Sequence, residues 1–173
     1  NSVLPYAVER DLLLRAADAL EKITGTRPVG IRTPSWDFSP NTLAIEKEMG
    51  LLYDSSLMAD EDCYELLLDG VPTGIVELPV EWVRDDAVYF MMHRFQSLRP
   101  HTPPREVLEI FRREFDAAYA EGGICQLTMH PHIIGYRSRI FIVEEIIRHA
   151  KAKGDVWFAT HRDVAAWAKA NAA

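Results

Sequence analysis

The sequence predicts an α/β fold that corresponds to part of a (β/α) barrel. Short apolar runs, which are typical of buried strands, alternate along the chain with segments of roughly ten to twenty residues that have helical periodicity. This alternation favours parallel βαβ units. About five strands are well marked, whereas a closed barrel needs roughly eight, so we expect part of a barrel. No linker, repeat or low-complexity segment interrupts the 173 residues, and we expect one domain over 1–173.

The longest helical pattern covers residues 5–24. Apolar residues recur there at steps of three and four and form one stripe, which we expect to face the core, with charged residues such as Glu9 facing solvent. The stripe consists of Val8, Leu12, Ala16, Ala19, Leu20 and Ile23. Further helices are predicted over 40–49, 102–121, 139–153 and after Thr160. Their start signals are Ser39-Pro40, Thr102-Pro103 and a capping box of Thr160 with Asp163.

Strands are predicted over 29–31, 51–53, 64–68, 74–80, 124–129 and 155–159, with a further short extended piece at 89–92. Asp69-Gly70 is a strong turn signal and predicts a hairpin, or a strand with a return, between residues 64 and 80. The carboxyl ends of parallel strands meet at one rim, where the sites of α/β proteins collect. Residues that follow strand ends are therefore the first candidates for chemistry.

Composition limits the class of partner. The net charge of −7 argues against a nucleic-acid or anionic-membrane partner, because both require a basic face. No apolar run approaches the ~20 residues of a membrane span, and the first residues lack the pattern of a signal peptide. Cys63 and Cys125 are far apart, so we expect free thiols and a reducing, cytoplasmic location. A single disulfide is the alternative.

Arg32 and His130 follow predicted strands and are the leading catalytic candidates. If the strands are parallel, both side chains reach the same rim. An arginine there can hold a carboxylate through two parallel hydrogen bonds, and a histidine can transfer a proton near neutral pH. The alternatives are a structural salt bridge for Arg32 and a hydrogen-bonded rim residue for His130.

Aromatic residues on two loops are candidates for substrate contact. Trp36 and Trp82 each follow a strand, and aromatic faces at the mouth of a site commonly stack on sugar rings or cap apolar pockets; plain packing is the alternative. Asp85-Asp86 could bind substrate hydroxyls, but a solvated turn is favoured, as it is for the acidic loop 54–62. Surface positions are expected for His93, His101, His149 and His161. No metal-binding motif occurs, so no metal ligand is predicted in this chain.

Four stretches together resemble the polysaccharide deacetylase family, the NodB-homology group. The stretches are residues 32–40 (RTPSWDFSP) with 53–58 (YDSSLM), then 78–86 (LPVEWVRDD), and finally 128–139 (TMHPHIIGYRSR). The similarity runs over essentially the whole chain and points to the branch with peptidoglycan-deacetylase-like proteins and cyclic amide or ureide hydrolases. It implies the C-terminal part of a distorted (β/α)7-type barrel that hydrolyses an amide C–N bond.

The resemblance also implies roles for individual residues. Arg32 would orient a catalytic carboxylate, His130 would protonate the leaving amine, and Pro34, Trp36 and Trp82 would line the substrate pocket. In metal-using members an aspartate and two histidines hold a divalent ion, zinc or similar, which polarises the carbonyl and activates a water. Those ligands precede the segment that begins here. The sequence departs from many relatives at Tyr136, where they carry arginine.

Several functions stay open at this point. The substrate is either an N-acetylated glycan, cleaved with a metal, or a small cyclic amide or ureide, cleaved without one. The alternative to an enzyme is a non-catalytic half-barrel that binds sugar or has a structural role. We expect the missing N-terminal part of the protein, in the same or a separate chain, to cover a bare edge at strand 29–32 or 155–159, since bare edges promote association. We also expect a homo-oligomer.

Overall fold

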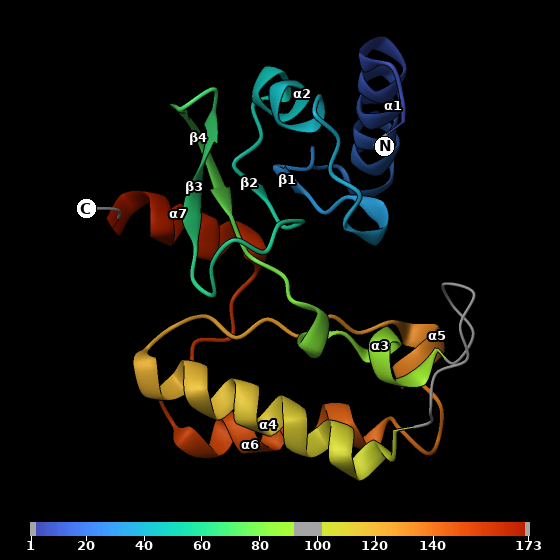
Figure 1. Cartoon of the computed structure of the whole chain (residues 1–173), viewed down its shortest axis with the longest axis vertical. Coiled ribbons are helices and arrows are strands. Elements are labelled where there is room, and N and C mark those ends of the chain that lie inside the picture. The colour runs from blue at the N-terminus through green and yellow to red at the C-terminus, as the bar shows by residue number, and fades with distance from the viewer. Residues whose placement is uncertain (1–2, 92–101, 172–173) are drawn as a thin grey trace. The chain divides into compact units, whose positions relative to one another are not determined.

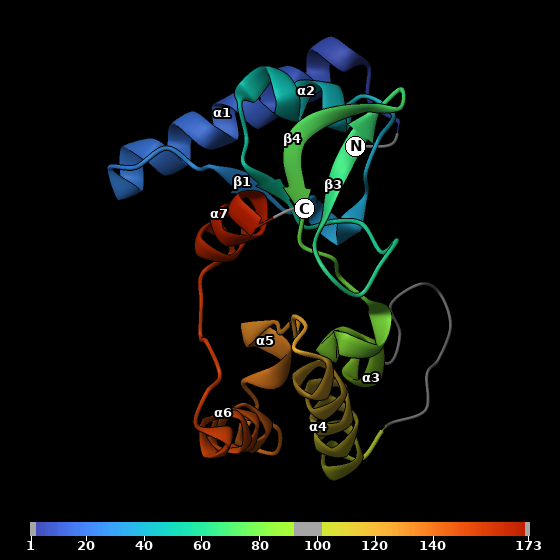
Figure 2. The same ribbon diagram turned by 90° about the vertical axis from the view of Figure 1, so that its left-hand side faces the viewer.

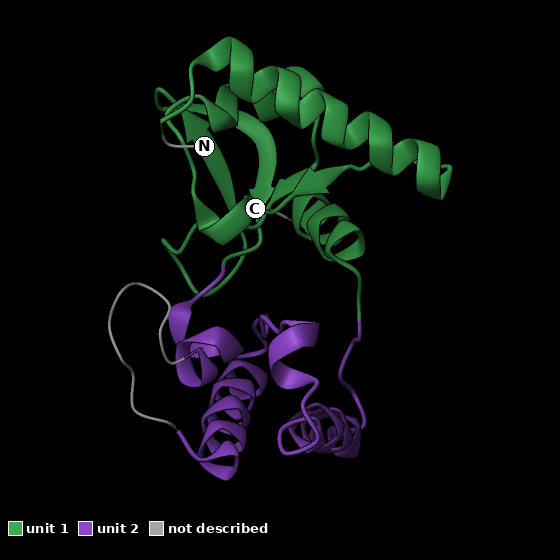
Figure 3. Ribbon diagram, turned by 90° about the vertical axis from the view of Figure 1, so that its right-hand side faces the viewer, with its two compact units in different colours: residues 1–79, 159–173 green, residues 80–158 purple. Residues whose placement is uncertain are grey.

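The computed structural model describes residues 3–91 and 102–171. They fall into two compact units (Figure 3): unit 1 comprises residues 1–79 and 159–173, and unit 2 comprises residues 80–158. The expectation of one domain over 1–173 stays a prediction, and each unit is described by itself. Among the described residues, no helix has both the length and the apolar character that crossing a membrane requires.

Unit 1 contains a four-stranded sheet with the order β1-β2-β4-β3 (Figure 1). The strands are β1 (Gly30–Ile31), β2 (Tyr53–Asp54), β3 (Tyr64–Leu68) and β4 (Val71–Glu77). β1 pairs in parallel with β2, and β2 with β4, as predicted. β3 and β4 form the predicted hairpin around Asp69-Gly70, where both residues have positive φ angles, as the tight turn requires. The carboxyl ends of β1, β2 and β4 therefore point to one edge.

Three helices and a short turn complete unit 1. They are α1 (Tyr6–Thr24), η1 (Pro34–Trp36), α2 (Thr42–Met49) and α7 (His161–Asn171). α1 lies beside α2, and α7 packs against β2 and β4 (Figures 1 and 2). α2 begins two residues later than predicted, and its N-cap is Asn41 rather than Ser39; Ser39 Oγ still accepts the backbone N–H groups of Asn41 and Thr42. At the predicted capping box, Thr160 Oγ1 accepts the N–H of Asp163 and its hydroxyl donates to Asp163 Oδ2.

The predicted burial of α1 is wrong. The apolar stripe lies largely in solvent: Val8, Leu12 and Leu20 are exposed, and Ile23 is 80% exposed. Glu9, expected in solvent, is instead 1% exposed. Its carboxylate accepts hydrogen bonds of 2.6 Å from the hydroxyls of Ser39 and Thr42, so Glu9, one of the two buried residues of α1 with Ala17, faces the start of α2.

Unit 2 is mainly helical. Its elements are η2 (Trp82–Arg84), α3 (Asp86–Phe90), α4 (Pro104–Glu121), α5 (Pro131–Ile134) and α6 (Phe141–Lys153). α4 and α6 lie side by side (Figure 1), as their apolar spacing predicts. The core between the helices is formed by Ala87, Phe90, Val107, Leu108, Phe111, Ile133, Ile134, Ile142 and Ile146.

Several predicted extended segments of this part are not paired strands. Residues 124–129 form a single parallel bridge, between Thr128 and Asp85, and residues 155–159 form no ladder among the described residues. Residues 89–90 belong to helix α3, and position 92 lies outside the described residues. Trp157 and Phe158 are exposed. Residues 155–159 therefore have the composition of a strand but pair with no neighbouring strand among the described residues.

Both cysteines are free, as predicted. Burial raises the pKa of the Cys63 and Cys125 thiols to about 11, so both are protonated and unreactive near neutral pH.

Candidate active site

His130 is placed in unit 2 by two short extended segments that lie side by side. The backbone N–H of Thr128 donates to the carbonyl of Arg84 at 2.8 Å, and that of Asp86 donates to the carbonyl of Thr128 at 3.1 Å. Asp85 and Asp86 therefore lie next to the segment that leads to His130. Pro131 follows directly and begins α5, which fixes the exit of the backbone from His130.

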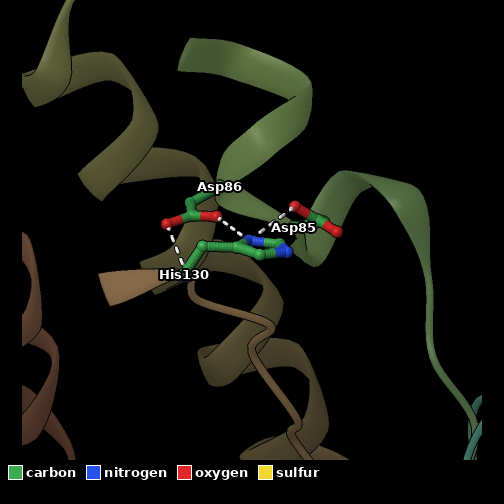
Figure 4. A group of neighbouring side chains, drawn as sticks. All are labelled: Asp85, Asp86 and His130. Atoms are coloured by element: carbon green, nitrogen blue, oxygen red, sulfur yellow. Dashed lines mark hydrogen bonds and ion pairs between the residues drawn. The ribbon is translucent and has the colours of Figure 1, made fainter. Parts of the chain in front are cut away.

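The side chain of Asp86 holds His130 at two points (Figure 4). Its Oδ1 atom lies 2.6 Å from Nδ1 of the imidazole, and its Oδ2 atom accepts the backbone N–H of His130 at 2.9 Å. Asp85 adds a second carboxylate, with Oδ1 at 3.8 Å from the same Nδ1 atom. The side chain of Asp86 is fully buried, whereas that of His130 is 30% exposed.

This arrangement suits proton transfer. A carboxylate that accepts from Nδ1 fixes the tautomer of the neutral ring, so Nε2 carries the exchangeable lone pair. When the ring is protonated, Nε2 becomes an acid and the buried carboxylate stabilises the imidazolium. The alternative interpretation of His130, a hydrogen-bonded rim histidine, agrees with the same contacts and with the partly exposed ring, so the catalytic role stays a prediction.

The interpretation of Asp85-Asp86 as a solvated turn is wrong. Both residues are buried, and Asp85 Oδ1 accepts the N–H of Ala87 at 2.6 Å as the N-cap of α3. An acidic residue followed by a helical segment is an N-cap signal, which was available in the sequence. The partnership of Asp86 with His130, 44 positions away, has no local signal.

Asp85, Asp86 and His130 also form a group that could hold a metal ion, since their ligand atoms lie within 4.8 Å of one another. Sequence spacing does not reveal this candidate. Ligands of one tetrahedral zinc ion lie about 3.3 Å apart, given metal–ligand distances of about 2.0 Å. The pair at 2.6 Å is shorter than this and has the length of a hydrogen bond. As placed, the group fits a carboxylate-held imidazole better than a metal centre.

Arg32 lies in unit 1, directly after β1. Its Nε atom donates to the carbonyl of Ser55 at 2.9 Å, and Nη2 donates to Ser55 Oγ at 2.7 Å. Ser55 is buried and donates in turn to the carbonyl of Leu78 at 2.7 Å. Arg32 is thus anchored to the segments that follow β2 and β4, at the edge where the parallel strands end.

His161 is a candidate that the sequence did not single out. It was expected at the surface, but its Nε2 atom lies 3.4 Å from Arg32 Nη2, and its ring stacks on Tyr53 with centroids 5.7 Å apart. Burial, followed by the charge of Arg32, lowers the pKa of His161. The signal in the sequence was its position after the extended segment 155–159, the same type of position as those of Arg32 and His130.

Three buried carboxyl groups lie beneath this edge: Asp54 at the end of β2, Glu77 at the end of β4 and Glu46 in α2. The solvated-loop interpretation of residues 54–62 is therefore wrong for the first part of that loop. Asp54 accepts from the N–H and hydroxyl of Ser56, and Glu77 accepts from the N–H of Leu57. Burial, together with the neighbouring Asp54, raises the pKa of Glu46 to about 10 and that of Glu77 to about 9.

The proposed pocket residues are divided between the units. Pro34 and Trp36 lie in η1 of unit 1, where Ser35 and Trp36 both adopt positive φ angles, near 57° and 56°. Such backbone is uncommon outside glycine and tends to occur at functional sites. Trp82 begins η2 of unit 2 and is 44% exposed. Arg32 and His130 likewise belong to different units, and their common rim stays a prediction.

Comparison with known proteins places these features in context. No family model matches the sequence. The chain is 26% identical, over 186 residues, to the peptidoglycan deacetylase of Helicobacter pylori; the alignment covers 91% of this chain and 62% of that protein.

Solved structures give closer matches. A Mycobacterium smegmatis protein assigned as a polysaccharide deacetylase is 34% identical with a TM-score of 0.86, and the match covers 96% of this chain and 58% of that one. PuuE allantoinase is 27% identical with a TM-score of 0.82, and the match covers 99% of this chain and 56% of that one.

These matches define the class as an α/β fold of the barrel type found in polysaccharide deacetylases. The similarity to deacetylases extends over 91% to 96% of this chain, as its motifs predicted. It spans 56% to 62% of the length of the relatives that it matches.

Proposed function

We propose that the protein containing this chain hydrolyses a non-peptide amide C–N bond, as an N-deacetylase of an acetylated glycan. The observation that carries the proposal is the Asp86–His130 pair, in which a fully buried carboxylate lies 2.6 Å from Nδ1 of a partly exposed imidazole. Amine leaving groups need a proton, and a histidine held in this way is oriented to donate one. The similarity to the peptidoglycan deacetylase of Helicobacter pylori supports the reaction class.

In this proposal His130 is the general acid. Its protonated Nε2 transfers a proton to the nitrogen of the breaking C–N bond, so that a neutral amine leaves. The carboxylate of Asp86 stabilises the imidazolium before the transfer, and the carboxylate of Asp85, 3.8 Å from Nδ1, adds to that stabilisation. Nε2 of His130 is then reprotonated from water for the next cycle.

Arg32 is proposed to orient the carboxylate that removes a proton from the attacking water. A guanidinium can hold a carboxylate through two parallel hydrogen bonds, which fixes its direction. The double anchoring of Arg32 to Ser55 supports a positioning role, because it limits the freedom of the guanidinium. Pro34, Trp36 and Trp82 are proposed to form the walls of the pocket, with the indole faces against the sugar ring.

Two parts of this site would come from outside the chain. The polypeptide that corresponds to the remaining length of the relatives would supply the carboxylate held by Arg32 and, in the metal-dependent form, the ligands of a divalent ion such as zinc. That ion, when bound, would polarise the acyl carbonyl and lower the pKa of a water.

The second candidate is metal-independent hydrolysis of a cyclic amide or ureide. It is favoured by the likeness to PuuE allantoinase, which extends over 99% of this chain. The same His130 would then protonate the ring nitrogen that leaves. A sugar-binding module without catalysis is the third possibility.

The test uses the full-length protein and three substrates: an oligomer of N-acetylglucosamine, a cyclic imide and allantoin. Each is assayed after treatment with EDTA and after addition of zinc. Release of acetate that requires zinc supports the proposal. Ring opening without dependence on metal favours the second candidate, and turnover of none of the three rejects both enzymes in favour of a binding module.

A further inference from the structure

His161 lies where three segments of unit 1 come together. It begins α7, stacks on Tyr53 of β2 and approaches Arg32 at the end of β1, with 3.4 Å between His161 Nε2 and Arg32 Nη2. Its ring is 21° from parallel to that of Tyr53, with the centroids 5.7 Å apart, so the imidazole forms an offset stack with the phenol. Because the ring is clamped in this way, Nε2 stays directed at the guanidinium.

The chemistry of the pair fixes the state of the imidazole. A guanidinium carries donors only, so a hydrogen bond with it requires a lone pair on His161 Nε2. The ring must therefore be neutral, with its proton on Nδ1. Burial and the charge of Arg32 lower the pKa of His161, which agrees with a neutral ring at pH 7.

We propose that His161 is a positioning residue that holds the guanidinium of Arg32, together with Ser55, by accepting a hydrogen bond on Nε2. Ser55 binds the Nε and Nη2 atoms of Arg32, and His161 adds a second acceptor at Nη2. The guanidinium plane is then fixed by contacts from two different elements. This inference rests on the proposed role of Arg32, since a fixed guanidinium plane fixes the direction in which it binds a carboxylate.

The arrangement also makes the hold on Arg32 sensitive to acid. Arg32 and Tyr53 are ionisable groups that face the ring, and Arg162, Arg32 and Asp54 are charges that act on Tyr53. Protonation of His161 would remove the acceptor and place a second cation beside Arg32. The guanidinium would then lose the acceptor that His161 provides.

The first experiment reads the tautomer and needs no activity. Long-range ¹H–¹⁵N spectra of the full-length protein, with ¹⁵N-labelled histidine, are recorded at pH 7, and the signal of His161 is assigned from its loss in His161→Gln. We expect the proton on Nδ1 and an unprotonated Nε2, whose resonance moves in Arg32→Met. A proton on Nε2, or a resonance that is the same in Arg32→Met, overturns the proposal.

The second experiment separates the hydrogen bond from packing. His161→Phe keeps a ring on Tyr53 but has no acceptor, whereas His161→Gln keeps an acceptor and cannot titrate. We expect kcat to fall about tenfold in His161→Phe with little change in KM, and to stay within about threefold of the wild type in His161→Gln. His149→Gln is the control, because His149 pairs with Asp116 in unit 2.

Failure of this inference can be distinguished from failure of the proposed function. If the wild type turns over no amide substrate while the spectra show the expected tautomer, the proposed function fails and the hold on Arg32 stands. If the wild type is active and His161→Phe keeps full kcat, the positioning role is wrong. Equal losses in His161→Phe and His161→Gln would also contradict it.

Discussion

The Nδ1 atom of His130 lies 2.6 Å from Oδ1 of Asp86, a carboxylate with no solvent exposure. A buried carboxylate that binds both the ring and the backbone N–H of the same histidine leaves the ring little freedom to turn. Asp86 therefore fixes the orientation and the tautomer of His130, and the proposed reaction depends on this pair.

Replacing Asp86 tests this dependence. Asp86→Asn keeps the shape but removes the charge that stabilises the imidazolium, so we expect kcat of the full-length protein to fall by about 100-fold or more with a small change in KM. Asp116→Asn is the matched control, because Asp116 pairs with His149 at 2.9 Å in the same unit. Asp116→Asn should change kcat by less than about twofold; equal losses in both variants would contradict the account.

Replacing Asp85 tests whether Asp85, Asp86 and His130 bind a metal ion or whether the two carboxylates only hold the imidazole. Asparagine caps helices as well as aspartate does, so Asp85→Asn should preserve the start of α3. If the metal ligands lie outside this chain, the zinc content of the full-length protein, measured by mass spectrometry after dialysis, should equal that of the wild type. EDTA should abolish deacetylation in both proteins, and zinc should restore it. A variant that no longer retains zinc would place the metal at Asp85, Asp86 and His130.

The buried Glu46 should make unit 1 less stable as the pH rises. In the folded protein its carboxyl keeps a proton that the unfolded chain loses above about pH 4.5, since its folded pKa is about 10. The folded state therefore binds more protons between about pH 4.5 and 10, and the free energy of unfolding falls across that range. Urea titrations at pH 5, 7 and 8 measure the slope.

Glu46→Gln should flatten this slope and raise the free energy of unfolding by about 1–3 kcal/mol at pH 7, because an amide N–H can replace the acid proton without a titration cost. Glu48→Gln, on the exposed side of the same helix, is the control and should leave the slope unchanged. A Glu46→Gln protein that is less stable than the wild type at pH 8 would show that the group is ionised in the folded state.

The edge of the sheet at β1 should be covered in the complete protein. In the described part of the chain, β1 pairs with β2 alone, and the neighbouring helix α1 exposes Leu12, Leu20 and Ile23. We expect backbone amides of peptides from residues 8–31 to exchange with deuterium at least tenfold more slowly in the full-length protein than in residues 1–173 alone. Equal exchange would mean that no further polypeptide covers this edge. Whether the protein forms a homo-oligomer stays a prediction.

Local patterns predicted the elements better than their burial. Turn chemistry predicts the hairpin at Asp69-Gly70, and apolar spacing predicts the helices α4 and α6; all three elements are formed. The face of α1 did not follow, because periodicity shows that a stripe exists but not whether a partner is present to cover it. Glu9 is buried because two hydroxyls satisfy its carboxylate, and those hydroxyls are 30 and 33 positions away.

The candidate site shows the same division. The positions of Arg32 and His130 after extended segments were sufficient to select them as candidates. Asp86 and His161 were missed, because an acidic pair and an isolated histidine resemble surface residues until the fold brings Asp86 to His130 and His161 to Arg32. Strand 124–129 was overestimated for a related reason, since a ladder needs a neighbour and only Thr128 pairs with one among the described residues.

The most direct test of the central claim compares two leaving groups. An amide needs a proton on its departing nitrogen, whereas 4-nitrophenyl acetate releases a stable anion that needs none. If His130 is the general acid, His130→Ala in the full-length protein should lose about 10²–10⁴-fold in kcat/KM on the amide and less than about tenfold on the ester. Equal losses on the two substrates, or full activity on the amide, would contradict the account.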